Sequence, residues 1–591
     1  MIRAEQAIAS GYAAYKRRDF AAARQALTGV SHPQAIHLLG LVEKNDGNYA
    51  KASSHLAEAA RLDPNNPEIA NNQGLLARLN GEYQVAETAF RRALSLNPDF
   101  RSARLSLSRT LNDAGRYRDA LVEVDPLLQR DPDDADAHIC AANAAMVDKD
   151  VDRVRRHLDA ARKSAPEKVS VRHTYGTYLL ETGAFQDAIA TFEGLLQDGV
   201  EDAKVHYMLA QAFFMLPDLD RARAEAGRAF EMMPSADTLL FLADLHRMMG
   251  DEQAFDRLVA VALQRRELAI SALSIMRKVD RYDAALQSWE RLDESVRVSV
   301  PGRYMKCALL LDSGRLDEAL SVVKEAYTDD PLRVDLFHIV RASLLAGAYG
   351  EALQFVREMR RRDPLDQFWL AYEVTTLRLL EDPQYSDLID YDRHVRTYRL
   401  DPPDGFETIE AFNAAMLDCL DRLNPFDVAP LDQSLRSGAQ TPQNLAALND
   451  PVLKAYFRAL DTPIRDYMGA IGAGPDHPTT NRNTGAYRFS GSWSVTLKSG
   501  GHHVNHIHPK GWISSAYYVS VPPNMGADGS KAGWIKFGEP PKDANLPLAP
   551  EKWIKPQAGM LVLFPSFCWH GTEPIKDGAV RVTAPFDIVP V

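Results

Sequence analysis

The sequence predicts a multidomain α + β protein, with an α-solenoid over its first two thirds and a β-rich domain at its C-terminal end. Three observations predict this fold: a 34-residue period, a helical stretch where the period fades, and a change to short strand-like runs near residue 480. We expect a solenoid over residues 1–380, a helical linker with bracing helices over 381–480, and a β-rich core over 481–591. A chain of 591 residues is too long for one hydrophobic core.

Several residue types carry the period at once. Prolines recur every 34 residues, and glycines, tyrosines and alanines keep the same spacing: Pro64, Pro98, Pro132 and Pro166; Gly47, Gly81 and Gly115; Tyr49, Tyr83 and Tyr117; Ala52, Ala86 and Ala120. Each type has a role in a pair of packed helices. Small residues and glycine allow close approach and a tight turn, the aromatic ring fills the angle between the helices, and proline ends the second helix.

One unit, "LLARLNGEYQVAETAFRRALSLNPD" at residues 75–99, resembles the tetratricopeptide repeat family, and the resemblance covers roughly residues 5–380. It implies helix pairs that stack into a superhelix with a concave groove. Most such arrays bind a partner, so we expect a protein or peptide substrate in the groove. An array that only joins subunits is the alternative, and formation of a homo-oligomer stays open.

Residues 381–480 are still helical but no longer periodic. The stretches "FETIEAFNAAMLDCLDRL" and "NDPVLKAYFRALDTPIRDYMGAI" both have apolar residues at helical spacing. The segment between them, "PLDQSLRSGAQTPQNL", is polar and rich in turn-forming residues. We interpret this region as helices that brace the final domain.

The C-terminal region has the texture of a β domain. From "YRFSGSWSVTLKSGG" onward, short runs rich in Val, Ile, Tyr and Trp are separated by Gly and Pro: "SWSVTLK", "SSAYYVSVP", "GWIKFG", "GMLVLFPS" and "RVTAPFDIV". Regularly spaced short strands with turn signals predict a sandwich or a barrel.

The stretch "HHVNHIH" places four of the sixteen histidines within seven positions. Residues two apart on a strand share a face, so His506 and His508 can both point into a barrel. The best candidate for a third ligand is His570, which ends the apolar run "LVLFPSFCWH". His502 has the parity of His506 and is a reserve ligand, whereas His503 should face the other way if the strand is regular.

Eleven residues after His570 come Arg581 and Thr583, again two apart. The order HxH, "SSAYYV", "GMLVLFPS" with a following His, and RxT resembles the Fe(II)- and 2-oxoglutarate-dependent dioxygenases. It is most similar to the bacterial group that joins tetratricopeptide repeats to a compact double-stranded β-helix domain, a jelly-roll or cupin-like fold. The resemblance covers about residues 390–591, most sharply 493–587.

The resemblance implies a metal site for iron. In that superfamily an HxD or HxE pair and a distal His hold Fe(II) and leave positions open for 2-oxoglutarate and oxygen. Carried over, His506 is the first ligand, His508 stands in the carboxylate's place and His570 is the distal ligand. The neutral His508 departs from the pattern, and a carboxylate such as Asp528 or Glu573 is an alternative ligand.

The resemblance also implies a co-substrate site. Arg581, with Thr583, would take the far carboxylate of 2-oxoglutarate, because a guanidinium fork matches a carboxylate. Tyr518 matches a tyrosine that often bonds the same carboxylate in the prolyl-hydroxylase-like branch. Ser514, on its side of the same strand, is a second candidate.

Composition excludes other classes of protein. A formal net charge of −12 argues against nucleic-acid binding, and no stretch has the roughly eighteen apolar residues that a membrane span needs. The beginning, "MIRAEQAIASGYAAYKRRDF", is typical of an amphipathic helix rather than a signal peptide. The four cysteines are far apart and form no CxxC pair, so we expect reduced thiols and a cytoplasmic protein.

Together these patterns predict a hydroxylase that uses Fe(II), 2-oxoglutarate and O2 to oxidise a protein or peptide captured by the repeat array. One alternative is a three-histidine metal cupin that does not use 2-oxoglutarate. The RxT pair argues against it, since such an enzyme needs no carboxylate clamp. A second alternative is an interaction scaffold built on the repeats, with a catalytically inactive barrel.

Overall fold

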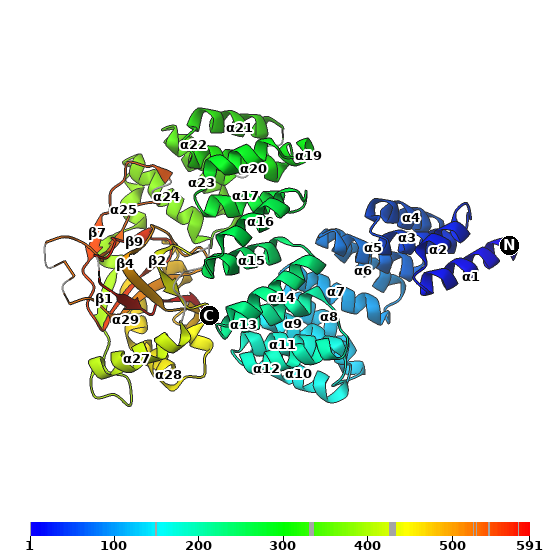
Figure 1. Ribbon diagram of the computed structural model, residues 1–591, viewed down its shortest axis with the longest axis horizontal. Coiled ribbons are helices and arrows are strands. Elements are labelled where there is room, and N and C mark those ends of the chain that lie inside the picture. Colours follow the sequence, from blue (N-terminus) through cyan, green and yellow to red (C-terminus); the bar gives the residue numbers. More distant parts are fainter. Residues whose placement is uncertain are drawn as a thin grey trace. The chain divides into compact units, whose positions relative to one another are not determined.

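The computed structural model describes residues 2–147, 151–329, 336–424, 433–523, 525–526, 529–541, 544–576 and 578–591. They form two compact units (Figure 1). The first unit comprises Met1–Glu181 with Asp187–Val200, and the second comprises Thr182–Gln186 with Glu201–Val591.

The first unit is a stack of helix pairs, as the period predicts. Its helices are α1 (Ile2–Lys16), α2 (Phe20–Leu27), α3 (Pro33–Asn45), α4 (Tyr49–Leu62), α5 (Pro67–Leu79), α6 (Tyr83–Leu96), α7 (Arg101–Asp113), α8 (Tyr117–Arg130), α9 (Ala135–Val147), α10 (Val151–Ser164), α11 (Val169–Glu181) and α12 (Phe185–Gln197).

The periodic residues have the packing roles expected of them. Gly81 has a φ of +76° in the turn between α5 and α6, a conformation that favours glycine. Ala86, on α6, is fully buried. A further periodic glycine, Gly74 on α5, lets the Phe90 ring of α6 pack so closely that an added Cβ would lie 2.7 Å from it. Such close approaches hold each helix pair together.

The second unit continues the helical array. Its helices before the C-terminal domain are α13 (Ala203–Met215), α14 (Leu219–Met232), α15 (Ala236–Met248), α16 (Glu252–Leu263), α17 (Ala269–Lys278), α18 (Tyr282–Glu290), α19 (Glu294–Arg297), α20 (Val300–Asp312), α21 (Leu316–Asp329), α22 (Leu336–Leu345), α23 (Tyr349–Arg362), α24 (Gln367–Leu379), α25 (Gln384–Leu388) and α26 (Tyr391–His394).

The rest of the second unit is a β domain with helices against it. Its helices are α27 (Ile409–Leu423), α28 (Pro451–Ala459) and α29 (Asp461–Ile471). Its strands are β1 (Arg396–Arg399), β2 (Leu435–Gln440), β3 (Tyr487–Ser492), β4 (Val495–His503), β5 (Ile513–Ser520), β6 (Ile535–Phe537), β7 (Lys552–Ile554), β8 (Met560–Pro565), β9 (His570–Thr572), β10 (Arg581–Thr583) and β11 (Phe586–Pro590).

The strands form two antiparallel sheets that are wound as a double-stranded β-helix. In the larger sheet, β10 lies between β4 and β5, and β5 also pairs with β8. In the smaller sheet, β6 lies between β7 and β9, and His570 at the start of β9 bridges to His506. From β7 to β10 successive strands alternate between the smaller and the larger sheet, and the predicted jelly-roll type of fold is confirmed.

The expected bracing helices are present, but the polar segment between them differs from its prediction. Both helical stretches form helices, α27 and then α28 with α29. The segment predicted as polar turns contains β2, an edge strand that pairs with β4. Edge strands need backbone partners rather than apolar side chains, which is why hydrophobic patterning missed β2.

The last repeats share one hydrophobic core with the β domain. Residues of α22, α23 and α24 cluster with Ile507, Phe537, Phe564 and Trp569 of the β domain. The indole of Trp569 donates to Thr375 Oγ1 on α24 at 2.8 Å, and Figure 1 shows α24 beside the C-terminal sheets. The end of the array therefore belongs to the same folded body as the β domain.

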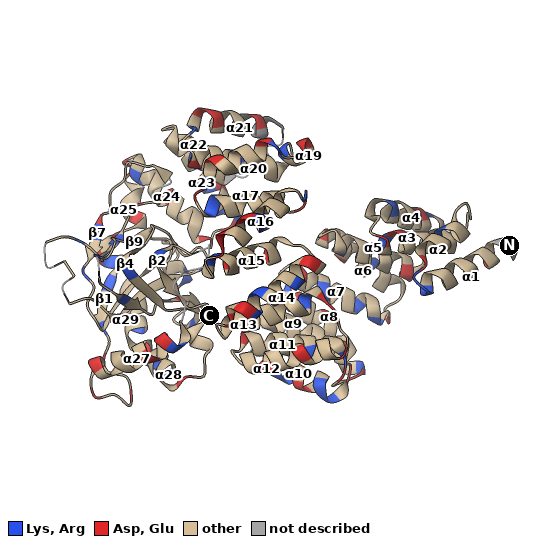
Figure 2. Cartoon of the chain, viewed as in Figure 1, with Lys and Arg blue, Asp and Glu red and all other residues tan. Residues whose placement is uncertain are grey.

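Charged residues of both signs are interspersed along the array helices (Figure 2). Many of them pair between neighbouring helices, as Arg101 does with Asp134 at 2.6 Å and Arg277 with Asp312. Within the described ranges, no helix is both long enough and apolar enough to cross a membrane.

Candidate active site

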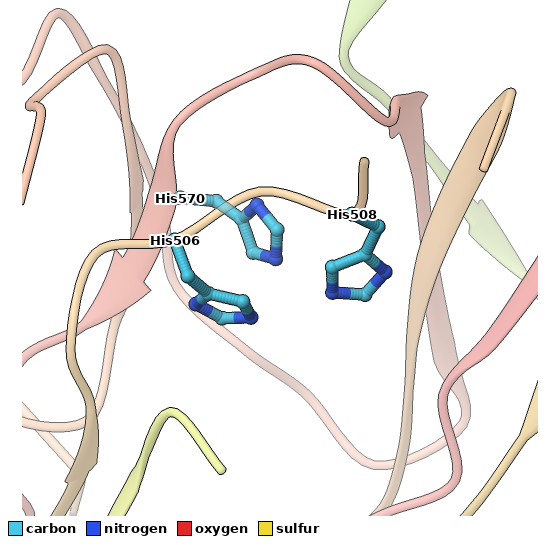
Figure 3. A group of neighbouring side chains, drawn as sticks. All are labelled: His506, His508 and His570. Carbon is cyan, nitrogen blue, oxygen red and sulfur yellow. The ribbon is translucent and has the colours of Figure 1, made fainter. Parts of the chain in front are cut away.

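Three histidines converge inside the β domain. His506 and His508 lie on the extended segment that follows β4, and His570 begins β9. Two backbone hydrogen bonds between His506 and His570, of 2.9 and 3.0 Å, hold the two segments side by side. The ligand atoms of the three rings lie within 4.8 Å of one another, and Figure 3 shows the rings turned toward a common point. Small rotations of the rings would bring all three nitrogens to one ion.

The hydrogen bonds of two rings determine which nitrogen carries the proton, and His506 Nε2 also lies 3.3 Å from the Ser434 hydroxyl. His506 Nδ1 donates to the Val504 carbonyl at 2.8 Å, and His570 Nδ1 donates to the Cys568 carbonyl at 2.9 Å. An Nδ1 that donates to a carbonyl carries the proton, so Nε2 keeps its lone pair. This arrangement orients metal-binding histidines in proteins generally.

Burial keeps these imidazoles neutral. It lowers the pKa of His506 to about 3 and holds the pKa of His570 well below its ordinary value, and a positive charge on a neighbouring histidine would lower both further. At neutral pH the two rings therefore carry no proton on Nε2 that a metal ion would have to displace.

His508 has a different partner from the other two. Its Nδ1 lies 2.6 and 2.8 Å from the two carboxylate oxygens of Asp587 on β11. The hydroxyl of Ser514 lies 3.1 Å from the same nitrogen and 2.8 Å from the hydroxyl of Ser566. Ser514 is fully buried behind His508 and is not among the residues that line the adjoining cavity.

A cavity of about 620 Å³ opens beside the three histidines. Arg581, Thr583 and Tyr518 line it, together with Asp587. Thr583 and Tyr518 are register partners across β10 and β5, so both side chains come from neighbouring strands. The structure thus brings three of the four predicted co-substrate residues to the histidine cavity.

Arg581 is a buried cation that has no anionic partner among the described residues. Its side chain is 2% exposed, one Nη donates to the Gly533 carbonyl at 2.7 Å, and Nε has no partner. Its guanidinium carbon lies 5.6 Å from the Tyr518 ring centre. Burial lowers the pKa of Arg581, and no carboxylate of the described residues forms an ion pair with it. An unpaired buried charge is costly, and an anionic ligand would relieve the cost.

The parity prediction for the first two histidines of the cluster is wrong. His503 lines the cavity, with its ring centre 5.6 Å from that of His506, whereas His502 does not line it. The regular strand ends at His503 and the chain bends at Asn505, so alternation does not continue from β4 to His506.

Glu573 and Asp528 are the predicted alternative metal ligands, and only Glu573 is among the described residues. Glu573 pairs with Lys536 at 3.1 Å and does not line the cavity of the histidines. Asp528 lies outside the described residues.

The prediction missed several residues of the site, above all Asp587. Positions 581, 583, 585 and 587 have one parity, and all four line the cavity. Extending the RxT pattern by two more steps would have found Asp587. Trp493, whose ring centre lies 5.5 Å from that of His508, and Ser434, whose hydroxyl lies 2.9 Å from His503 Nδ1, gave no comparable signal.

The residues fit a divalent metal with a dicarboxylate beside it. Three imidazole nitrogens suit Fe(II) and similar ions, and all three rings line the cavity. The unpaired Nε of Arg581 marks where a carboxylate would be bound. Such a site can hold an ion and an anionic ligand in one cavity.

Comparison with known families agrees with the division of the chain into a repeat array and a C-terminal β domain. The family model described as "Putative 2OG-Fe(II) oxygenase" matches residues 491–587. Two models described as "Tetratricopeptide repeat" match within the array, one at residues 77–144 and the other at residues 37–100 and 175–237.

Individual proteins resemble part of the chain. The cellulose synthase operon protein C of Pseudomonas fluorescens is 22% identical over 325 residues, which are 53% of this chain and 24% of that protein. Among solved structures, a tetratricopeptide repeat protein from Parabacteroides merdae is 16% identical with a TM-score of 0.37, over 41% of this chain and 98% of that chain. A thermophilic TPR protein from Thermus thermophilus is 21% identical with a TM-score of 0.29, over 30% of this chain and 98% of that chain.

The family matches and the fold lead to one description of the chain. It contains tetratricopeptide repeats in its N-terminal region and, at residues 491–587, a region similar to the "Putative 2OG-Fe(II) oxygenase" family.

Proposed function

We propose that this protein is an Fe(II)- and 2-oxoglutarate-dependent dioxygenase that hydroxylates a protein or peptide. One observation carries the proposal: three converging histidines line the same cavity as a buried arginine that pairs with no carboxylate in the part of the chain that the structure describes. A metal site alone would not need Arg581, and a buried arginine alone would not need the histidines.

When bound, Fe(II) and 2-oxoglutarate would supply oxidative chemistry, in which O2 converts 2-oxoglutarate to succinate and CO2 and hydroxylates a substrate C–H bond. The Nε2 atoms of His506, His508 and His570 would hold the metal. Arg581, with Thr583 beside it, would bind the far carboxylate of the co-substrate and direct its other end toward the metal.

The cavity wall would keep water from the reacting groups. Phe564 and Ile535 are buried residues of the lining. The Phe564 ring centre lies 4.6 Å from that of His570. Apolar walls of this kind strengthen the electrostatic interactions inside a site and limit side reactions with solvent.

Arg581 also argues for 2-oxoglutarate over a metal cupin that works without it. A cupin of that kind would leave a buried guanidinium with no ligand to balance its charge. An anion held by Arg581 is therefore part of the proposed chemistry. The match to the oxygenase family supports 2-oxoglutarate, a five-carbon dicarboxylate, as that anion.

A second cavity supports a polypeptide substrate. It measures about 630 Å³ and lies between the array and the β domain, within the second unit. Arg277 and Asp312 line its array side, and Glu573 lines its β-domain side. Its wall shares His503 and Thr572 with the histidine cavity. A chain bound in this cavity, beside α17 and α20, would therefore lie next to the proposed metal site.

The test is an anaerobic titration of the metal-free protein with Fe(II) and then 2-oxoglutarate. We expect a visible charge-transfer band in the wild type, retained in the Arg488→Ala control, whose exposed side chain is on β3. Arg581→Ala should lose the band at co-substrate concentrations that saturate the wild type, a loss of about 100-fold or more in affinity.

Admitting O2 then separates an enzyme from an inactive scaffold. Succinate released in step with 2-oxoglutarate consumed supports an active oxygenase. A band without succinate would indicate a binding domain that has lost activity. Fe(II) binding without any effect of 2-oxoglutarate would favour the cupin alternative.

A further inference from the structure

His508 is the only one of the three clustered histidines whose Nδ1 faces a charged group. His506 and His570 each donate to a carbonyl two residues earlier in the chain. The partner of His508 is instead Asp587, 79 positions away, with both carboxylate oxygens within 2.8 Å of Nδ1. The histidine that stands in the place of a carboxylate ligand is thus the one with a carboxylate behind it.

The fold holds Asp587 in this position. Asp587 is the register partner of Ser514 across β11 and β5, and the β11–β3 pairing shifts its register immediately after Asp587. Its side chain is 14% exposed, and no lysine or arginine of the described chain pairs with it. The Ser514 hydroxyl, 3.1 Å from His508 Nδ1, closes the space beside the contact. The carboxylate is therefore committed to His508.

The contact between His508 and Asp587 would change the net charge around a bound metal ion. Three neutral imidazoles leave the full charge of a divalent ion uncompensated, whereas a ligand set with one carboxylate removes one unit of it. A carboxylate that accepts the Nδ1 proton of a metal-bound histidine raises the basicity of the ring and returns part of the missing negative charge. Asp587 is placed to do so through a single imidazole.

We infer that Asp587 is a positioning residue that supplies the negative charge of the metal site through His508, in place of a carboxylate bound directly to the metal. This inference rests on the proposed function for the identity of the metal. It makes a prediction about metal affinity that does not depend on 2-oxoglutarate or turnover.

The experiment measures the affinity of the full-length protein for Co(II) by calorimetry, with the visible absorption of bound Co(II) as a second readout. Asp587→Asn preserves the size of the side chain and an oxygen that can accept from His508, and it removes the charge. We expect the affinity to fall by about 10- to 100-fold and the Co(II) spectrum to change. Fe(II) titrated anaerobically should follow the same order.

A charge swap tests the role of Asp587 against a purely structural one. His508→Asp alone would place two carboxylates against each other, and their repulsion should weaken Co(II) binding relative to the wild type. Adding Asp587→Asn to this variant should restore affinity by about tenfold or more, because the new amide can donate to the new carboxylate. Asp587→Asn would then weaken Co(II) binding in the wild type and strengthen it in the His508→Asp variant.

Asp392→Asn is the matched control. It makes the same change at an exposed carboxylate that pairs with Lys552 of β7 at 2.8 Å and lines neither cavity. We expect its Co(II) affinity to equal that of the wild type within about twofold.

Several results would overturn the inference. An Asp587→Asn affinity equal to that of the wild type would do so, and so would a loss of affinity in both backgrounds. If Asp587→Asn does not fold, the His508→Asp variant gives the test. If that variant binds Co(II) as tightly as the wild type does, the inferred role of Asp587 is rejected. A wild type that binds neither Co(II) nor Fe(II) would reject the proposed function itself.

Discussion

Arg581 is a buried charge that should lower the stability of the ligand-free protein. Its guanidinium is buried, its Nε has no partner, and its charge faces a cavity. Burying an ion without a partner costs several kcal/mol, and here that cost falls on the ligand-free protein. Binding of a carboxylate would relieve it, which links the stability of the domain to the presence of the ligand.

Replacing Arg581 with a neutral side chain should therefore stabilise the ligand-free protein. For Arg581→Met we expect the free energy of unfolding to rise by about 1–3 kcal/mol, together with loss of 2-oxoglutarate binding. Urea unfolding of the metal-free protein measures the first effect. Arg488→Met, at an exposed position on β3, should stay within about 0.5 kcal/mol of the wild type. A destabilised Arg581→Met would show that the arginine has a structural role.

Tyr518 provides a second test at this scale. Its side chain is buried in the wall of the cavity beside Arg581. Tyr518→Phe removes one hydroxyl and leaves the ring, so we expect 2-oxoglutarate to bind about 5- to 10-fold more weakly, the value of one hydrogen bond. The anaerobic charge-transfer titration measures this change. Unchanged affinity would remove Tyr518 from the co-substrate site.

At the scale of elements, the site depends on irregular segments between strands. His506 and His508 lie after the end of β4, and a turn at Pro509–Lys510 then leads into β5. Same-face spacing was a correct guide for His506 and His508, whose rings meet, but it failed across the bend for His503. Periodicity describes regular strands, and this segment is held instead by its bridge to β9.

Gly511 tests how tightly that turn is packed. A Cβ at Gly511 would lie 2.3 Å from the Ser566 hydroxyl, which bonds to Ser514 behind His508. Gly511→Ala should lower stability by about 1–3 kcal/mol and weaken Co(II) binding, because the hydroxyls behind His508 must move. Gly474→Ala is the control, since its Cβ would meet nothing within 4 Å. Equal behaviour of the two variants would contradict the packing argument.

At the scale of the whole molecule, the array and the oxygenase domain are not separable at residue 380. The core that joins α22–α24 to the β domain includes Trp369 and Tyr372 on one side and Trp569 on the other. Further hydrogen bonds cross the same boundary. Arg378 donates to the Gly538 carbonyl at 2.8 Å, and the backbone N–H of Gln367 donates to the Pro509 carbonyl at 3.1 Å. The final repeats are therefore structural parts of the folded body that contains the β domain.

This shared core predicts how fragments will behave. A fragment of residues 381–591 should not unfold cooperatively, because it exposes the apolar face that α24 covers, whereas residues 201–591 should fold as a unit. Circular dichroism during thermal unfolding compares the two fragments. A cooperative transition of the shorter fragment at the temperature of the longer one would show that the repeats are dispensable.

Low pH should destabilise the second unit, because this unit contains buried histidines outside the histidine cavity. The ring of His394 stacks on His477 with centres 5.1 Å apart, and burial lowers the pKa of His394 to about 4. In the unfolded chain the pKa is about 6.5, so stability is full above that pH and falls as the pH drops toward 4.

Removing the buried histidine should flatten this dependence. Between pH 7.5 and 5, we expect the metal-free wild type to lose about 2 kcal/mol more of its unfolding free energy than His394→Asn. Urea unfolding at the two pH values measures the difference. Equal losses in the two proteins would mean that His394 is not kept neutral by the fold.

The sequence by itself determined the features that depend on local order. The 34-residue period specified the helix pairs, and two-residue spacing specified that His506 and His508 share a face, as Arg581 and Thr583 do. These patterns come from the geometry of helices and strands, which neighbouring residues already encode.

Only the tertiary structure decided which residues complete the site. The contact of Asp587 with His508 spans 79 positions, and that of Trp569 with Thr375 spans 194. The place of His503 in the cavity depends on a bend, and β2 depends on its partner strand. Such contacts arise when distant segments pack together, and packing has no period that a single sequence displays.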